Sequence, residues 1–138
     1  MDIKTQLINA ALLARKKAYA PYSHYLVGAA VLAPSGNIYT GCNIENASYP
    51  AGICAERTAI FKAVSEGERK ITHIALAAGE EKLEQPLPNY PSPCGICRQV
   101  MAEFCEENAV ILLAKSEEDY LEYTLSELLP LSFTAKDL

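Results

Sequence analysis

The sequence predicts an α/β fold, with helices layered on a mixed sheet. Its length of 138 residues suits one compact domain and is short for two, so we expect a single domain over residues 1–138. Half of the residues are hydrophobic and 21% are charged, which is enough apolar material for a core. Short apolar runs are separated by helix-length segments, and this implies crossover connections between strands.

Periodicity and turn residues define the expected elements. Apolar residues recur at spacings of three and four after Asp2, a plausible N-cap, and Gly67 suits a helix C-terminus. Turn residues at 34–37 indicate a hairpin of two antiparallel strands. The expected elements are helix 2–18, strands 25–32 and 38–45, helix 55–67, strand 71–78, helix 94–106, strand 110–114, a strand near 120–123 and a short helix over 126–129.

Composition excludes several classes of function. The net charge is -5 and no Lys/Arg cluster is present, so a polymeric nucleic acid is disfavoured as a partner while a single nucleotide-like molecule is not. No apolar run reaches the roughly 18 residues that cross a bilayer, and the first residues lack the order of a signal peptide. We therefore expect a cytoplasmic protein with no membrane partner.

The cysteines indicate metal or catalytic chemistry. Five cysteines, an odd number, in a chain without an export signal argue against a disulfide framework. Cys94 and Cys97 follow Pro93 at i and i+3, and at a helix start this spacing brings both sulfurs to one side. Taken alone, the motif leaves a zinc site, a thioredoxin-like redox pair and two buried cysteines open.

A third cysteine narrows these alternatives. Cys54 also stands at an expected helix start, so the two helix starts can face each other. Three thiolates leave one tetrahedral position for water, which is typical of a catalytic zinc, and Glu56 could lie beside that water. In a structural zinc or redox protein, Glu56 would have no reason to lie there. Cys42, Cys105, His24 and His73 are expected to be structural or surface residues.

Six segments together carry a family resemblance. They are Tyr19–Ser23, Val27–Ala30, Gly41–Ala47, Cys54–Ala59, Pro93–Gln99 and Glu127–Pro130. With the cysteine pattern, they resemble the cytidine deaminases of the short-chain type that assembles as a homotetramer. The resemblance implies a three-layer α/β/α fold with a mixed five-stranded sheet, and one zinc ion per chain on Cys54, Cys94 and Cys97. It implies Glu56 as the catalytic proton shuttle.

The substrate-binding residues follow from position and resemblance. Asn43 and Glu45 are two apart on an expected strand, so both face one side, and an amide with a carboxylate can hold a ribose hydroxyl. The resemblance assigns them to the 3′-hydroxyl and adds Ala55 to the substrate contacts. Tyr25 stands where the family usually has a phenylalanine that stacks on the base, and a phenol ring can stack equally well.

Three further residues complete the expected site. Arg57 could donate hydrogen bonds to the thiolates of Cys94 or Cys97 and draw charge off the sulfur. Tyr49 and Phe133 resemble family residues that complete the pocket of a neighbouring subunit.

The expected activity is zinc-dependent hydrolytic deamination of cytidine and 2′-deoxycytidine to uridine and 2′-deoxyuridine plus ammonia, in pyrimidine salvage. The alternative within the enzymes is a deaminase of a cytosine nucleoside antibiotic such as blasticidin S. An editing enzyme acting on RNA or single-stranded DNA shares the chemistry, but the acidic balance speaks against it.

Overall fold

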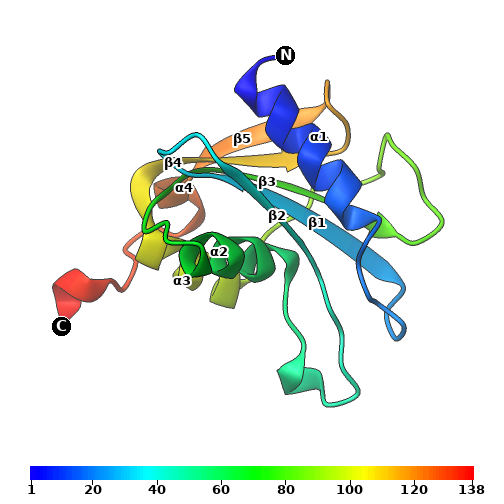
Figure 1. Ribbon diagram of the computed structural model, residues 1–138, viewed down its shortest axis with the longest axis horizontal. Helices are drawn as coiled ribbons and strands as arrows, with labels where there is room; N and C mark the ends of the chain where they lie inside the picture. The colour runs from blue at the N-terminus through cyan, green and yellow to red at the C-terminus, as the bar shows by residue number, and fades with distance from the viewer.

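The computed structural model describes residues 1–138 as helices on both faces of one sheet (Figure 1). The elements in chain order are α1 (Ile3–Arg15), β1 (Tyr25–Leu32), β2 (Ile38–Cys42), the 3-10 turn η1 (Tyr49–Ala51), α2 (Ala55–Ser65), β3 (Ile71–Glu80), α3 (Gly95–Phe104), β4 (Cys105–Ala114), β5 (Tyr120–Thr124), α4 (Leu125–Leu128) and the 3-10 turn η2 (Ala135–Asp137).

The sheet has five strands in the order β2-β1-β3-β4-β5. β1 pairs antiparallel with β2 and β3, and β5 pairs antiparallel with β4. β3 and β4 are parallel, with α3 in the connection between them. The predicted hairpin and the predicted mixed five-stranded sheet are therefore confirmed.

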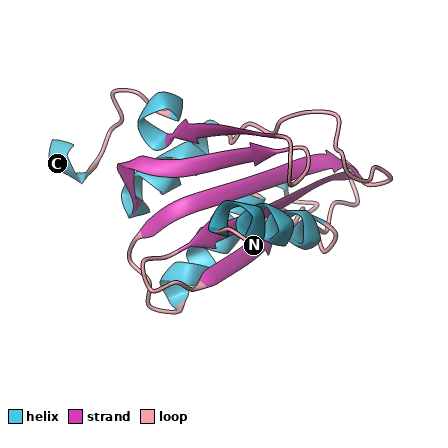
Figure 2. Ribbon diagram, turned by 90° about the horizontal axis from the view of Figure 1, so that it is seen from above, coloured by secondary structure: helices cyan, strands magenta, loops and turns pink.

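Two hydrophobic cores give the predicted three layers. α1 packs on one face of the sheet with a core that includes Leu7, Ala30 and Ala75. α2 and α3 pack on the other face with a larger core that includes Ile60 and Met101. Figure 2 shows α1 alone on the near side of the strands, with other helices behind them. α2 and α3 lie side by side on one layer, which lets their first residues share a site.

Each helical layer touches the sheet backbone at a glycine. Gly28 of β1 lies against the backbone of α1, and Gly41 of β2 lies against the backbone of α2. A side chain at either position would collide with main-chain atoms. Both helices are therefore held closer to the sheet than any other residue would allow.

The start of α1 and the end of α2 follow the sequence signals, whereas α1 ends early. The Asp2 side chain accepts a hydrogen bond from the Thr5 amide at 2.9 Å, as an N-cap does. Arg15 ends α1 three residues before the predicted limit at Ala18. Gly67 takes a φ of +105° just after α2, the left-handed conformation that glycine adopts at helix C-termini.

Several predicted boundaries are wrong, and the errors at β4 and β2 change the element in which Cys105, Asn43 and Glu45 lie. β4 begins at Cys105, five residues before the predicted start, because Cys105 pairs with Ile71 of β3 in extended conformation. Cys105 therefore lies on a strand and not within the predicted helix 94–106. β2 ends at Cys42, so the strand predicted to reach Glu45 stops three residues short. The backbone beyond it bonds instead to Tyr19 and Ile53. None of the helices has the length and apolar character needed to cross a membrane.

Candidate metal and nucleoside site

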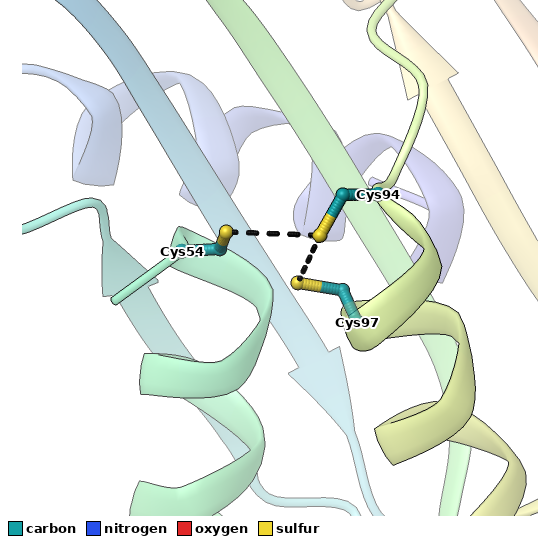
Figure 3. A group of neighbouring side chains, drawn as sticks. All are labelled: Cys54, Cys94 and Cys97. Atoms are coloured by element: carbon teal, nitrogen blue, oxygen red, sulfur yellow. Dashed lines mark hydrogen bonds between the residues drawn. The ribbon is translucent and has the colours of Figure 1, made fainter. Parts of the chain in front are cut away.

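Three thiols meet at the starts of two neighbouring helices. Cys54 is the N-cap of α2, Cys94 is the N-cap of α3, and Cys97 lies in the first turn of α3. The sulfur atoms of Cys94 and Cys97 are 3.4 Å apart, and those of Cys54 and Cys94 are 3.9 Å apart. Figure 3 shows the three side chains pointing toward one another from the two helices. The three sulfurs lie within 4.8 Å of one another, so this cluster can hold one ion.

The sulfur spacing fits zinc. Two sulfurs that each lie about 2.3 Å from a tetrahedral zinc ion are about 3.8 Å apart, and the two hydrogen-bonded pairs are 3.4 and 3.9 Å apart. Thiolates are soft ligands, which zinc accepts readily. Neither N-cap cysteine uses its side chain to cap its helix, so both sulfurs are free to face the ion.

Arg57 provides a positive charge beside the cluster. Its Nη2 donates a hydrogen bond to the Cys54 sulfur at 3.5 Å. The sequence predicted Cys94 or Cys97 as the acceptor, whereas the hydrogen bond in the structure goes to Cys54. Hydrogen bonding to Cys54 is the largest cause that raises the pKa of Arg57, and hydrogen bonding to Cys97 contributes less. Arg57 and Cys54 lie three apart on the first turn of α2, which brings them onto one face of the helix.

The thiols shift one another's pKa values. The neighbouring Cys97 thiol lowers the pKa of Cys54 to about 5; burial opposes this shift, and Arg57 and Cys94 add smaller contributions in the same direction. The proximity of Cys54, together with burial, raises the pKa of Cys97. Cys54 thus has thiolate character at neutral pH, the form that binds metal.

Glu56 brings a buried carboxyl group to the same place. It is the second residue of α2, only 5% exposed, and it lines the cavity that also holds Cys54 and Cys94. Burial raises the pKa of Glu56 above the ordinary glutamate value. A carboxyl group with a raised pKa holds its proton more readily than an ordinary glutamate, which suits a group that accepts and then donates protons.

The cavity beside the thiols has a volume of about 600 Å³. The cysteine end includes Ala55, which is fully buried at the start of α2. Apolar side chains of β1 and β3 also line the cavity, as do polar side chains such as those of Asn43 and Glu45. Other residues that line the cavity include Tyr22, Ser23, Tyr25, Val27, Asn43, Glu45, Tyr49, Leu76, Ala78 and Ser92. This volume lies in the range of small-molecule sites.

Asn43 lines the cavity while its amide holds the start of β1. Its Oδ1 accepts a hydrogen bond from the Val27 amide at 2.8 Å, and its Nδ2 donates to the Tyr25 carbonyl at 2.8 Å. The sequence predicted that Asn43 would lie on a strand, which would set the direction of its side chain. This is wrong, because β2 ends one residue earlier, at Cys42. One acceptor lone pair and one amide hydrogen remain for another partner.

Glu45 accepts hydrogen bonds from the loop before β1. Its Oε1 accepts from the amides of Tyr22 at 3.0 Å and Ser23 at 3.1 Å, and its Oε2 accepts from the Ser23 hydroxyl at 2.5 Å. The bond from Ser23 lowers the pKa of Glu45. Sequence reasoning assigned no role to Ser23, although it ends one of the resemblance segments, because no spacing rule links it to Glu45.

The aromatic residues have distinct positions. Tyr25, at the start of β1, is 41% exposed and lines the cavity. Tyr49 is 77% exposed and also lines the cavity, and its ring centroid lies 6.1 Å from that of Tyr22 at an angle of 57°. Phe133 is 58% exposed and is not among the lining residues of this chain's cavity. Its carbonyl accepts a hydrogen bond from Gln99 at 2.8 Å.

Comparisons with known proteins agree with this geometry. Residues 1–113 match the family described as cytidine and deoxycytidylate deaminase zinc-binding region. A cytidine deaminase of Halalkalibacterium halodurans is 49% identical over 135 residues, covering 98% of this chain and 97% of the relative. One of Sporosarcina psychrophila is 48% identical over 138 residues, covering 100% and 96%.

The fold is also similar to that of solved cytidine deaminase structures. The crystal structure of cytidine deaminase from Burkholderia pseudomallei superposes with a TM-score of 0.83 at 40% sequence identity, covering 96% of this chain and 100% of that one. Sequence and structure thus match over nearly the whole chain, and the matching region includes all three thiols and Glu56. The chain belongs to the cytidine and deoxycytidylate deaminase family.

Proposed function

We propose that this chain hydrolyses cytidine and 2′-deoxycytidine to uridine and 2′-deoxyuridine with release of ammonia, as an enzyme of pyrimidine salvage. The observation that carries the proposal is the buried Glu56 carboxyl in the same cavity as the thiols of Cys54 and Cys94. Hydrolytic deamination of a cytosine ring needs a metal site and a proton carrier side by side. Family membership supports this reaction.

The metal site consists of Cys54, Cys94 and Cys97, with one zinc ion per chain. When bound, zinc supplies Lewis acidity that activates water at neutral pH. Three thiolates donate much negative charge and weaken that acidity. Arg57 offsets part of this charge, because its hydrogen bond to Cys54 draws electron density from the sulfur.

Glu56 is the proton carrier of the reaction. Attack at C4 of cytosine requires a proton at N3 and then a proton on the leaving amine. One carboxyl group can do both in turn. It takes the first proton from the attacking water and delivers it to N3, then takes the remaining proton from the new hydroxyl group on C4 and delivers it to the amine as the C4–N bond breaks and ammonia leaves. The burial that raises the pKa of Glu56 suits this exchange, because it makes the carboxyl group a better proton acceptor than an ordinary glutamate.

Asn43 and Glu45 hold the 3′-hydroxyl of the sugar in this proposal. Each already has fixed hydrogen bonds to the start of β1 or the loop before it, so each is oriented before substrate arrives. Each keeps hydrogen-bonding capacity toward a ligand. Tyr25 stacks on the base, and Ala55 contacts it from the start of α2.

A homotetramer is the proposed assembly, with one deaminase domain per chain over residues 1–138. Phe133 lies outside the lining of its own cavity, and Tyr49 is largely exposed at the cavity wall. Both are free to contact a neighbouring pocket, which supports the cross-subunit role suggested by the resemblance. Light scattering with activity measured across dilution tests this, and a fully active monomer would contradict it. The cytoplasmic location stays a prediction.

The alternatives are less well supported. The names of the relatives favour cytidine over a blasticidin-type antibiotic. A structural zinc site or a redox pair leaves the buried carboxyl of Glu56 unexplained. A net charge of -5 disfavours RNA or single-stranded DNA as substrate.

One assay tests the proposed function. Purified protein is given cytidine, 2′-deoxycytidine, free cytosine and blasticidin S in parallel, and ultraviolet absorbance follows loss of the amino group. We expect turnover of both nucleosides and very little of free cytosine. Faster turnover of blasticidin S than of either nucleoside would overturn the assignment of substrate.

A further inference from the structure

Arg98 joins the start of α3 to the C-terminal part of the chain. It directly follows Cys97, and its side chain donates three hydrogen bonds. Nε donates to the Pro93 carbonyl at 2.7 Å, Nη2 to the Ser92 hydroxyl at 2.7 Å, and Nη1 to the Leu128 carbonyl at 2.5 Å. One guanidinium group thus holds the two residues before Cys94 and the last residue of α4.

The segment held by Arg98 leads directly into Cys94. Cys94 is the N-cap of α3 and has no side-chain capping bond, so its thiol is placed by the main chain that enters the helix together with its contacts to Cys54 and Cys97. The Arg98 amide also donates to the Cys94 carbonyl at 3.0 Å. Main chain and side chain of Arg98 therefore fix the same three residues, and Ser92 among them also lines the cavity.

The helix α4, which accepts the Arg98 hydrogen bond at Leu128, is anchored in the hydrophobic core. Leu125 of α4 is 4% exposed within the core that also contains α2 and α3. The Leu128 carbonyl ends α4, where a helix leaves carbonyl groups without internal partners. Arg98 supplies that partner. Gln99 adds a second tie to the C-terminal segment through Phe133.

We propose that Arg98 is a positioning residue that holds Cys94 ready for the metal by tying residues 92–94 to α4. The planar guanidinium places donors on three separate nitrogen atoms and so reaches three separated acceptors at once, whereas an ammonium group donates from a single nitrogen and a glutamine amide has only two N–H groups. Without it, Cys94 must be ordered when the ion binds, and the affinity falls. The inference rests on the proposed function only through the zinc site.

The test compares zinc affinity in Arg98→Gln, Arg98→Lys and wild type, by competition with a chromophoric chelator. The matched control is Arg69→Gln, because Arg69 donates to the carbonyls of Val64 at 2.9 Å and Glu68 at 2.8 Å, away from the thiols. Loss of a residue that orients a metal ligand typically weakens binding about 10- to 100-fold. We expect that loss in Arg98→Gln, a smaller loss in Arg98→Lys and none in Arg69→Gln.

Several outcomes would overturn the proposal. One is a loss under about fivefold in Arg98→Gln, below the range for an orienting residue. Another is an equal loss in Arg98→Gln and Arg69→Gln, which would indicate general destabilisation. If Arg98→Gln does not fold, Arg98→Lys and Ser92→Ala decide: weaker zinc binding in both supports the proposal, and wild-type affinity in either overturns it.

Hydrogen exchange on metal-free protein gives a second reading. Arg98→Gln should speed exchange in residues 92–98 and leave residues 62–69 unchanged, and Arg69→Gln should do the reverse. Equal acceleration in both segments would contradict a local role. Wild-type turnover of cytidine in the same preparation tests the proposed function separately, since the affinity comparison does not depend on activity.

Discussion

Gly28→Ala and Gly41→Ala form a matched pair that separates stability from function. At Gly41 an added Cβ would lie 2.5 Å from the Ala59 nitrogen and 2.8 Å from the Ala55 oxygen. These are backbone atoms of α2, so no side-chain rotation relieves the collision. Reaching an ordinary contact of 3.4 Å requires the two backbones to separate by about 0.9 Å at the closest pair.

The same change at Gly28 is more severe but affects the other layer. There an added Cβ would lie 2.0 Å from the Ala11 oxygen and 2.4 Å from the Arg15 nitrogen, both in the backbone of α1. Overpacking costs typically about 1–3 kcal/mol. At roughly 4 °C per kcal/mol for a chain of this size, each variant should melt about 4–12 °C lower. Gly28→Ala should lose at least as much stability as Gly41→Ala.

The loss of activity should be larger in Gly41→Ala, the variant expected to lose less stability. α2 begins at Ala55 and carries Glu56, with Cys54 as its N-cap, whereas α1 carries no residue of the proposed site. Misplacement of reacting groups by about 1 Å can cost on the order of 100-fold in rate. We expect kcat/KM for cytidine to fall by about that factor in Gly41→Ala and by less than about threefold in Gly28→Ala.

The assay uses zinc-loaded proteins at a temperature below both melting transitions, with thermal melts recorded by circular dichroism. Zinc content is measured in each sample, so that loss of metal is separated from loss of turnover. Equal loss of kcat/KM in the two variants, or a greater loss in Gly28→Ala, would refute the reasoning that α2 positions the reacting groups.

Two further predictions concern acidic side chains. Glu45→Ala should reduce the preference for cytidine over free cytosine by roughly tenfold to a hundredfold, because the 3′-hydroxyl loses a charged acceptor. The preference is measured as the ratio of kcat/KM for the two substrates. Equal losses of kcat/KM for cytidine and for cytosine would contradict the prediction. Hydrogen bonds from Ser35 at 2.6 Å and Tyr39 at 2.9 Å lower the pKa of Glu68. The stabilisation from the charged Glu68 carboxylate is therefore fully present above its ordinary pKa of about 4.5. It is lost as the pH falls through the lowered pKa of the folded protein. The melting temperature of metal-free Glu68→Gln should therefore vary less than that of wild type below about pH 4.5, and an identical pH dependence would contradict the assignment.

The main elements of the fold could be predicted because local signals agree with tertiary packing. Turn residues around Gly36 delimit the hairpin, and Gly67 marks the end of α2. The start of β4 could not be predicted, because Glu106 and Glu107 interrupt its apolar run. Parallel pairing that begins between Ile71 and Cys105 determines this boundary, and no local pattern reports it.

The candidate site shows the same division. Cys54, Cys94 and Cys97 could be predicted to meet, because helix starts and short spacing constrain where the sulfurs lie. The sulfur atom that accepts the hydrogen bond from Arg57 could not be predicted, since it depends on the side-chain conformation at the start of α2. The pairing of Ser23 with Glu45 joins residues far apart in the chain, and only the folded structure brings them together.

Turnover by Glu56→Gln most directly tests the central claim that Glu56 carries protons beside a zinc site made by three cysteines. The amide has nearly the same shape as the carboxyl group and none of its proton exchange, so the metal-binding cysteines stay in place. The measurement is the initial rate of cytidine deamination by wild type and Glu56→Gln at equal zinc content. General acid–base catalysis contributes about 100- to 10,000-fold, so we predict a rate at least about 100-fold lower with one zinc per chain retained. A zinc-loaded Glu56→Gln protein that keeps more than about a tenth of the wild-type rate would contradict the account.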